Sequence, residues 1–350
     1  MDQLALYRKY RPTKFAEVLG QNQVISVLAG AIKQGQVAHA YLLAGPRGTG
    51  KTSVARIFAN ELATSPNDLY EIDAASNRGV DEIRELRAAV ATLPFDSKYK
   101  VYIVDEVHML TREAFNALLK TLEEPPAHVI FVLATTEIHK LPETIISRCQ
   151  TLSFRPPAIE LVATVIKRIS RAEGRTIDEE AINLIALLGD GSFRDAIGVL
   201  QQVMSVAPAQ KIGLAEVEAV TAAPRRQSVE QFLTAATNGD LAGGLAAVRQ
   251  AVKQNYDFKI WVKLILQQLR LALLLKFAPN LKTELLADLS ANELKFLTAL
   301  ANSPKANLLP ELLRQLLAVY DELGRSTLPE LPLELVLVRL FGQPEEVVNK

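Results

Sequence analysis

The N-terminal half of the chain alternates short apolar runs with segments in which apolar residues recur every three or four positions. The runs at 41–44, 101–104 and 129–134 are continuous, which is typical of strands buried on both faces of a parallel sheet. Shorter strands are expected at 69–73 and about 151–154. Helices are expected at 21–34, 53–62 and 112–122, and along a stripe formed by Val80, Ile83, Leu86 and Val90. This alternation indicates the α/β class, an open sheet with helices on both faces.

The pattern changes after Pro156 and Pro157. From there to about residue 222 only helical patterns occur, and a second break at 223–226 opens a Leu- and Ala-rich tail. We therefore predict three domains: an α/β domain at 1–157, a small helical domain at 158–223 and an all-α domain at 224–345.

Composition narrows the functional classes. The 350 residues carry a net charge of zero, so any contact with nucleic acid would need a local basic face. The only cysteine is Cys149, which excludes an internal disulfide and a Cys-based zinc site, and the four histidines show no metal-ligand spacing. No apolar run approaches the roughly 18–20 residues of a membrane span, and no signal peptide is evident. We expect a cytoplasmic protein without membrane contact.

A glycine-rich turn follows the first apolar run. Residues 45–52 read Gly-Pro-Arg-Gly-Thr-Gly-Lys-Thr, the P-loop pattern G-x-x-x-x-G-K-[ST] between a predicted strand and a predicted helix. Backbone N–H groups of such a loop surround phosphate oxygens, the lysine reaches the β- and γ-phosphates, and the final hydroxyl binds Mg²⁺. The alternative is a chance glycine-rich turn. The predicted nucleotide-binding residues here are Gly45, Pro46, Arg47, Gly48, Thr49, Gly50, Lys51, Thr52 and Ser53.

Polar residues end the next two buried strands. Asp105 fits the Walker B acid that holds Mg²⁺, and Glu106 would orient or deprotonate the attacking water. Thr135 would hydrogen-bond the γ-phosphate or that water. The alternatives are a solvated acid at a strand end for Glu106 and a hydroxyl that caps the strand for Thr135. Ligands of open α/β sheets lie at the carboxyl ends of the strands, where all these residues fall.

Several longer motifs carry a family resemblance. They include LYRKYRP, HAYLLAGPRGTGKT, EIDAASNRGVDEIREL, VYIVDEVHML, FNALLKTLEEPP, FVLATTE, KLPETIISRCQ and GSFRDAI, in that order from residue 6 to residue 197. In these motifs the chain resembles the AAA+ ATPases and, more closely, the gamma/tau family of bacterial clamp-loader subunits of DNA polymerase III. The resemblance is weaker and mainly topological over the C-terminal tail.

The resemblance implies ATP and Mg²⁺ as cofactors and gives further residues roles. Arg148 would be an arginine finger acting on the nucleotide of the adjacent subunit, and Arg194 a lid-domain sensor that touches the γ-phosphate of its own. A structural salt bridge is the alternative for either arginine. The N-terminal basic segment would line the adenine side of the pocket instead of forming a solvated arm. Its predicted residues are Tyr7, Arg8, Tyr10, Arg11, Pro12 and Val18.

The chain departs from the family at one place. The family's usual four-cysteine zinc module is missing between the P-loop helix and the second strand, where only residues 63–68 stand. We predict no zinc, and contacts that the module makes with neighbouring subunits are in doubt. This trimming also resembles the small subunits of replication factor C. The chain ends near Lys350 without the long tau extension, so we expect the short gamma form or a truncated chain.

A local basic stripe offers a possible DNA contact. Arg78, Arg84, Lys98 and Lys100 lie in and after the helix that follows the second strand. Backbone contact with primer–template DNA needs only such a stripe on each subunit. An ordinary solvated helix face is the alternative.

The resemblance implies an ATPase motor that opens and loads a sliding clamp onto primed DNA. Its partners would be the clamp, delta- and delta-prime-type subunits, further copies of itself through an all-α collar, and primer–template DNA at the replication fork. Two alternatives stay open: another AAA+ DNA motor, such as a branch-migration enzyme, and a scaffold subunit that does not hydrolyse ATP.

Overall fold

We describe a computed structural model of the chain, covering residues 4–76, 86, 88–206, 211–278, 291–323 and 326–342. Contacts divide the chain into two compact units, residues 1–214 and 215–350. The first unit holds the predicted α/β domain and most of the predicted helical domain at 158–223, of which residues 215–223 fall in the second unit. Within the described ranges, no helix is long and apolar enough to cross a membrane.

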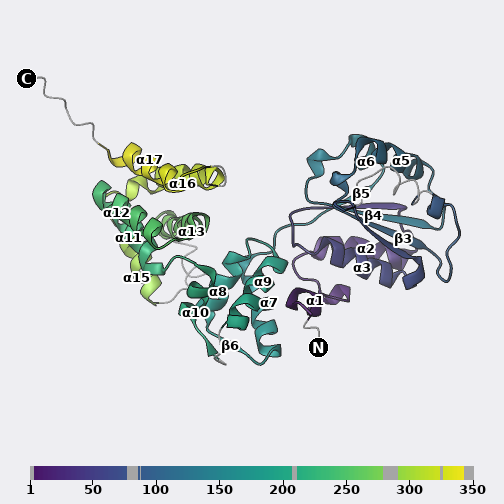
Figure 1. The fold of residues 1–350 in the computed structure, drawn as a ribbon, viewed down its shortest axis with the longest axis horizontal. Helices are drawn as coiled ribbons and strands as arrows, with labels where there is room; N and C mark the ends of the chain where they lie inside the picture. The colour runs from purple at the N-terminus through teal and green to yellow at the C-terminus, as the bar shows by residue number, and fades with distance from the viewer. Residues whose placement is uncertain are drawn as a thin grey trace, which may run out of the picture. The chain divides into compact units, whose positions relative to one another are not determined.

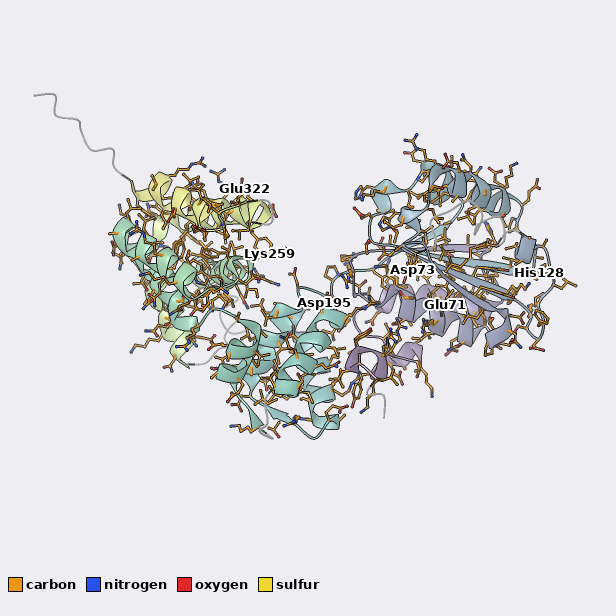
Figure 2. The ribbon with its side chains drawn as sticks, in the orientation of Figure 1. Glu71, Asp73, His128, Asp195, Lys259 and Glu322 are labelled. Carbon is orange, nitrogen blue, oxygen red and sulfur yellow. The ribbon has the colours of Figure 1, made fainter. Side chains whose placement is uncertain are left out.

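A parallel five-stranded sheet forms the centre of the first unit (Figure 1). Its order is β2-β3-β4-β1-β5, and every pairing is parallel. All carboxyl ends therefore lie at one edge; Figure 2 shows Asp73, which ends β2, and His128, which precedes β4, at opposite ends of the sheet. The strands are β1 (Ala40–Ala44), β2 (Leu69–Asp73), β3 (Lys100–Asp105), β4 (Val129–Thr135) and β5 (Gln150–Ser153).

Helices cover both faces of this sheet, as predicted. Helices α2 (Asn22–Gln34) and α3 (Lys51–Glu61) lie on one face, and α5 (Arg112–Glu123) and α6 (Glu143–Ile146) on the other (Figure 1). Alternate residues of β1 serve the two cores: Tyr41 packs with the α2–α3 side and Leu42 with the α5 side. Both faces of the strand are buried, which explains its unbroken apolar sequence.

Local signals in the sequence set the helix ends. Gly35 follows α2 in the left-handed conformation, with φ 67°. The N–H of the next residue, Gln36, donates to the carbonyl oxygen of Ala31 and ends the helix. Thr111 caps α5 by accepting a hydrogen bond from the N–H of Ala114 at 3.2 Å. The other predicted strands and helices of the α/β domain agree with the structure to within two residues at each end. The helix predicted along Val80, Ile83, Leu86 and Val90 lies mostly outside the described residues.

A helical bundle completes the first unit. It contains α7 (Ile159–Ala172), α8 (Glu179–Leu188) and α9 (Phe193–Val206), and the short N-terminal helix α1 (Leu6–Lys9) packs against α9. The expectation of helices alone was wrong here: β6 (Thr176–Ile177) and β7 (Lys211–Ile212) pair in parallel. Strands of two residues are too short to show a period in sequence.

The second unit is helical in its described residues. Its core surrounds the fully buried Trp261, whose ring meets the rings of Phe232 and Phe258 edge-on. Asp257 caps the longest of these helices by accepting from the N–H groups of Lys259 and Ile260. The helices are α10 (Leu214–Thr221), α11 (Arg226–Asn238), α12 (Leu241–Lys253), α13 (Phe258–Phe277), α15 (Ala291–Ala301), α16 (Leu309–Glu322) and α17 (Leu331–Phe341).

Candidate nucleotide site

The P-loop depends on glycine at two close approaches. Gly45 and Gly48 have φ of 155° and 73°, values that residues other than glycine rarely adopt. A Cβ on Gly45 would collide with the carbonyl oxygen of Phe154, and one on Gly48 with the hydroxyl of Ser192. The loop therefore contacts the end of the sheet on one side and the helical bundle on the other.

Lys51 begins helix α3 and is buried at the base of the loop. Its Nζ donates to the carbonyl oxygens of Gly45 and Pro46, both at 2.8 Å. Burial lowers the pKa of Lys51, while the nearby carboxylates of Glu106 and Asp105 act to raise it. A cation at a helix N-terminus, bound only to neutral carbonyls of its own loop, suits a polyanion such as a polyphosphate.

Thr52 and Asp105 meet where a divalent ion would be held. The Thr52 hydroxyl donates to Asp105 Oδ2 at 2.7 Å, and Asp105 Oδ1 accepts from the N–H of Glu106 at 3.0 Å. A hydroxyl and a carboxylate oxygen are ligands that Mg²⁺ accepts beside phosphate oxygens. These residues fit the predicted metal role.

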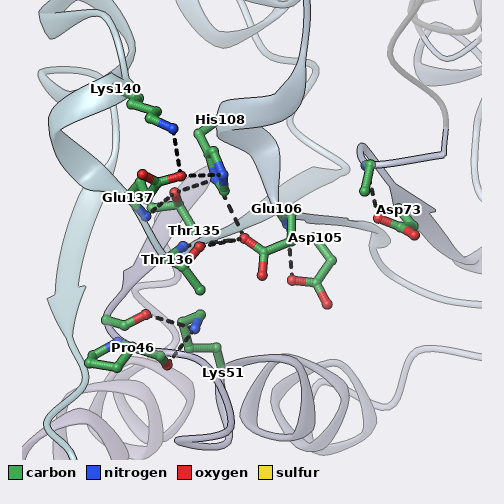
Figure 3. Close-up of polar contacts among 12 residues, drawn as sticks. Pro46, Lys51, Asp73, Asp105, Glu106, His108, Thr135, Thr136, Glu137 and Lys140 are labelled. Atoms are coloured by element: carbon green, nitrogen blue, oxygen red, sulfur yellow. Dashed lines mark hydrogen bonds and ion pairs between the residues drawn. The ribbon is translucent and has the colours of Figure 1, made fainter. Parts of the chain in front are cut away.

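Glu106 faces the same cavity from a strained position. Its φ of 49° lies in the left-handed region, which costs a non-glycine residue about 1–2 kcal/mol. The Thr136 hydroxyl donates to Glu106 Oε2 at 2.9 Å (Figure 3). Thr136 was not among the predicted site residues.

Thr135 has the contacts of its alternative role, a hydroxyl that caps the end of the strand. It is the last residue of β4 and is completely buried, and its Oγ1 accepts from the N–H of Glu137 and lies 3.0 Å from His108 Nδ1. Neither Thr135 nor Thr136 lines the cavity, but Thr136 is hydrogen-bonded to Glu106, which does. The contact of Thr135 with water or γ-phosphate stays a prediction.

One cavity brings most predicted residues together. It also has six lining residues that the sequence reasoning missed: Glu17, Leu19, Val165, Arg168, Phe193 and Ile197. Phe193 and Ile197 belong to the GSFRDAI motif but were given no role. The packing of the bundle against the P-loop brings them to the cavity together with Val165 and Arg168. The predicted residues that line it are Tyr7, Tyr10, Arg11, Pro12, Val18, Arg47, Gly48, Thr49, Gly50, Lys51, Thr52, Ser53, Asp105, Glu106 and Arg194.

The N-terminal segment is bound to the rest of the unit and is not a free arm. Lys9 and Tyr10 both contact Glu173 of the bundle, at 2.8 and 2.5 Å, and Arg11 Nε donates to Ser53 Oγ at 3.0 Å. Burial lowers the pKa of Arg11, and the positive charges of nearby arginines add to this effect. Arg8 does not line the cavity; its guanidinium lies 5.8 Å from the centre of the Tyr7 ring, and its Nε donates to the Tyr7 hydroxyl at 3.3 Å.

The helical bundle closes over the P-loop as a lid. The N–H of Phe193 donates to the carbonyl oxygen of Gly48 at 3.1 Å. Arg194 lines the cavity with its guanidinium 5.8 Å from the centre of the Tyr7 ring. This position suits the predicted contact of Arg194 with a nucleotide bound to its own chain.

Arg148 lies outside this cavity, at the end of α6. Its Nη2 pairs with Glu123 Oε1 at 2.7 Å, and its Nη1 donates to the carbonyl of Thr144 at 2.9 Å. Its side chain is 34% exposed. An arginine in this position does not serve its own site, and its role at a neighbouring one stays a prediction.

The basic stripe is only partly within the described residues. Arg78 and Arg84 lie outside them, and Lys98 is exposed. Lys100 is only 1% exposed, and its Nζ donates to Thr92 Oγ1 at 2.6 Å and to the carbonyls of Ala89 and Thr92. The predicted DNA contact at Lys100 is therefore wrong, because its charge is used inside the fold to close a helix end.

A buried carboxylate orders the loop that follows this helix end. Asp68 accepts hydrogen bonds from the N–H groups of Phe95, Asp96 and Ser97 at 2.7–2.9 Å. Burial acts to raise the pKa of Asp68, but these bonds outweigh it and hold the value at about 2. The ordered loop presents Leu93 and Phe95, which are 76% and 77% exposed.

Among the described residues, no group of three or more potential metal ligands occurs, and the absence of zinc stays a prediction.

A parallel sheet, a P-loop after β1, acids after β3 and a helical lid define the AAA+ class of P-loop proteins. The RuvB Holliday junction branch migration motor of Thermotoga maritima has this fold, with a TM-score of 0.52 at 24% identity over 65% of this chain and 79% of that one. At this identity the likeness concerns the fold alone.

Sequence comparisons define the family. The model for the DNA polymerase III delta subunit matches residues 20–79 and 64–158, and that for domain III of subunits gamma and tau matches 212–350. The DNA polymerase III subunit gamma of Buchnera aphidicola (subspecies Baizongia pistaciae) is 35% identical over 79% of this chain and 80% of its own. The chain belongs to the gamma/tau family of DNA polymerase III subunits. Subunit tau of Bacillus subtilis is 40% identical over 81% of this chain, which spans 54% of that relative's length.

Proposed function

We propose that the chain is an ATP-hydrolysing subunit of a replicative clamp loader. The observation that carries this proposal is the convergence of Lys51, the Thr52–Asp105 pair and the Glu106–Thr136 pair at the cavity of a gamma/tau family member. A scaffold subunit would have no need for a buried lysine and a strained acid at the same place.

The residues of the site divide the work of hydrolysis. Lys51 would exchange its two carbonyl partners for β- and γ-phosphate oxygens. Thr52 and Asp105 would hold Mg²⁺, which when bound neutralises charge that develops on the phosphates. Glu106 would orient the attacking water and take its proton. Tyr7 and Arg194 would close the pocket and keep other water out.

The remaining group would come from a second subunit. Arg148 would reach the γ-phosphate bound to the adjacent protomer and stabilise the transition state, an effect typically of about 10³–10⁵ in rate. ATP would thus bind at subunit interfaces, and its hydrolysis would report on the geometry of the assembly. Delta- and delta-prime-type subunits, further copies of the chain and the sliding clamp are the proposed partners. Primer–template DNA would act as the trigger, with Arg78, Arg84 and Lys98 as proposed contacts.

ATP turnover by the assembled loader tests this function. We expect turnover to rise when the sliding clamp and primed DNA are added, and Lys51→Ala to abolish it together with nucleotide binding. Turnover without stimulation by the clamp would favour another AAA+ DNA motor. Absence of turnover in the complete assembly would favour a scaffold subunit.

A further inference from the structure

His108 is a buried histidine beside the acid that would activate water. It belongs to the short helix η3 (Val107–Met109), its side chain is only 5% exposed, and it does not line the cavity. Its Nε2 lies 3.1 Å from Glu137 Oε2, and its Nδ1 lies 3.0 Å from Thr135 Oγ1 and 3.4 Å from Glu106 Oε2 (Figure 3). The ring thus stands between two carboxylates.

The partners of the ring assign its protons. A carboxylate can only accept a hydrogen bond, so Nε2 must carry the hydrogen that it shares with Glu137. Glu137 is held ionised by Lys140, whose hydrogen bond at 2.8 Å lowers the pKa of that carboxyl. Thr135 Oγ1 accepts from the N–H of Glu137 and has capacity to accept a second hydrogen bond, so both Thr135 Oγ1 and Glu106 Oε2 can accept from an N–H at Nδ1. Both nitrogens are therefore satisfied, and the ring has one defined orientation.

This orientation fixes one side of the Glu106 carboxylate. Oε2 of Glu106 accepts from the hydroxyl and the N–H of Thr136, at 2.9 and 3.4 Å, and lies 3.4 Å from Nδ1 of His108. Glu106 itself lines the cavity, so its second oxygen is the one available to a reacting water. The strained turn at Glu106 brings the side chains of residues 106 and 108 to the same side of the strand end.

We propose that His108, anchored by Thr135 and Glu137, is a positioning residue that holds the Glu106 carboxylate in its water-activating orientation. The inference rests on the proposed ATP hydrolysis. His108 does not line the cavity, so it would touch neither nucleotide nor metal. Its loss should slow the chemical step and leave the affinity for nucleotide unchanged. A displacement of about 1 Å at a reacting group can reduce a rate about 100-fold, so the expected loss in kcat is about 10–100-fold.

The test compares His108→Ala with His139→Ala in the full chain assembled with its partner subunits, clamp and primed DNA. His139 lies in the short helix η4 (Ile138–Lys140); its side chain is 74% exposed, and its Nε2 lies 3.9 Å from Oε1 of the same Glu137. We expect His108→Ala to reduce kcat about 10–100-fold with the Kd for ATP unchanged within about twofold, and His139→Ala to change neither. His108→Gln, whose amide can donate to Glu137, should recover part of the loss.

A further variant keeps the experiment decisive if the alanine variant folds poorly. Thr135→Val removes the hydroxyl that faces Nδ1 and leaves the ring in place, and it should reduce kcat in the same direction. Equal turnover in wild type, His108→Ala and Thr135→Val would overturn the inference while the proposed function stands. A loss of ATP binding parallel to the loss of kcat would show a merely structural role. If the wild-type assembly hydrolysed no ATP at all, the proposed function would fail, and this inference with it.

Discussion

The two predicted catalytic arginines occupy contrasting surroundings. Arg194 lines the cavity beside Tyr7, on a lid that is hydrogen-bonded to the P-loop through Phe193 and Gly48. Arg148 lies outside that cavity, partly exposed, and is held by a single carboxylate of the neighbouring helix and a carbonyl. The difference indicates that Arg194 is placed to contact a ligand bound to its own chain, whereas Arg148 is placed to contact another molecule.

The contrast follows from the partners that each charged group has inside the chain. Groups that serve the fold, such as Lys100 and Asp68, have all their partners inside the chain. Lys51 has only neutral partners that an anion can replace. An exposed ion pair such as Arg148–Glu123 is worth only about 0–1 kcal/mol, so an adjacent phosphate can take over the arginine at little cost.

Replacement of Arg148 by alanine should have the largest effect. We expect turnover of the assembled loader to fall about 10³-fold or more, because transition-state charge loses its partner. Nucleotide affinity of the isolated chain should not change, since Arg148 does not line its own cavity. Steady-state turnover and equilibrium binding of a fluorescent ATP analogue measure the two effects, with Arg171→Ala on the exposed side of α7 as the control. Weaker binding by the isolated Arg148→Ala chain would contradict the contrast.

Replacement of Arg194 by alanine should act on the chain's own site. We expect its affinity for ATP to fall about 10–100-fold, the effect of losing a hydrogen bond from a charged donor. The control is Arg8→Ala, which removes a guanidinium that contacts the Tyr7 ring but does not line the cavity, and it should alter affinity less than about threefold. Equal losses in the two variants would mean that the lid arginine is not a nucleotide contact.

Replacement of Asp68 by asparagine should affect folding and not turnover. Asp68 accepts from the backbone N–H groups of residues 95–97 with both of its oxygens, whereas asparagine has only one acceptor oxygen. At least one of these N–H groups therefore loses its partner, which lowers the free energy of unfolding by about 1–3 kcal/mol. The folded pKa of about 2 lies below the ordinary value of 3.8, so this carboxylate stabilises the fold above about pH 4 and loses its contribution as pH falls toward 2. Urea unfolding at a series of pH values should show this component in the wild type and not in the variant. An identical pH dependence in both would refute this role.

The smallest effect is expected from Glu123→Gln, which removes the carboxylate that holds Arg148. The free energy of unfolding should change by less than about 1 kcal/mol, because the pair is exposed. Turnover in the assembly should not fall, since Arg148 keeps its charge and gains freedom to reach the neighbour. A large fall would show that the ion pair itself positions the arginine.

Much of the sheet and of the site could be predicted from the sequence. Short buried strands and the P-loop are local signals, so strand ends and the places of Lys51, Thr52 and Asp105 followed directly. Whether Thr135 faces the cavity or caps the strand could not be predicted, because that depends on where β4 ends. Lys100 was assigned to a surface because its partners, Ala89 and Thr92, lie on another element. The lid residues Val165 and Arg168 reach the cavity only through tertiary packing, which no local pattern encodes. Phe193 could have been found, because it precedes the predicted Arg194 in the GSFRDAI motif.

The most direct test of the shared site mixes two inactive chains. Lys51→Ala lacks the P-loop contact but keeps Arg148, whereas Arg148→Ala lacks the arginine but keeps an intact pocket. If each site combines a P-loop from one subunit with Arg148 from the next, an equal mixture should regain about a quarter of wild-type turnover, since one interface in four then pairs the two intact halves. A mixture no more active than its separate components, or an Arg148→Ala assembly with wild-type turnover, would contradict a site shared between subunits.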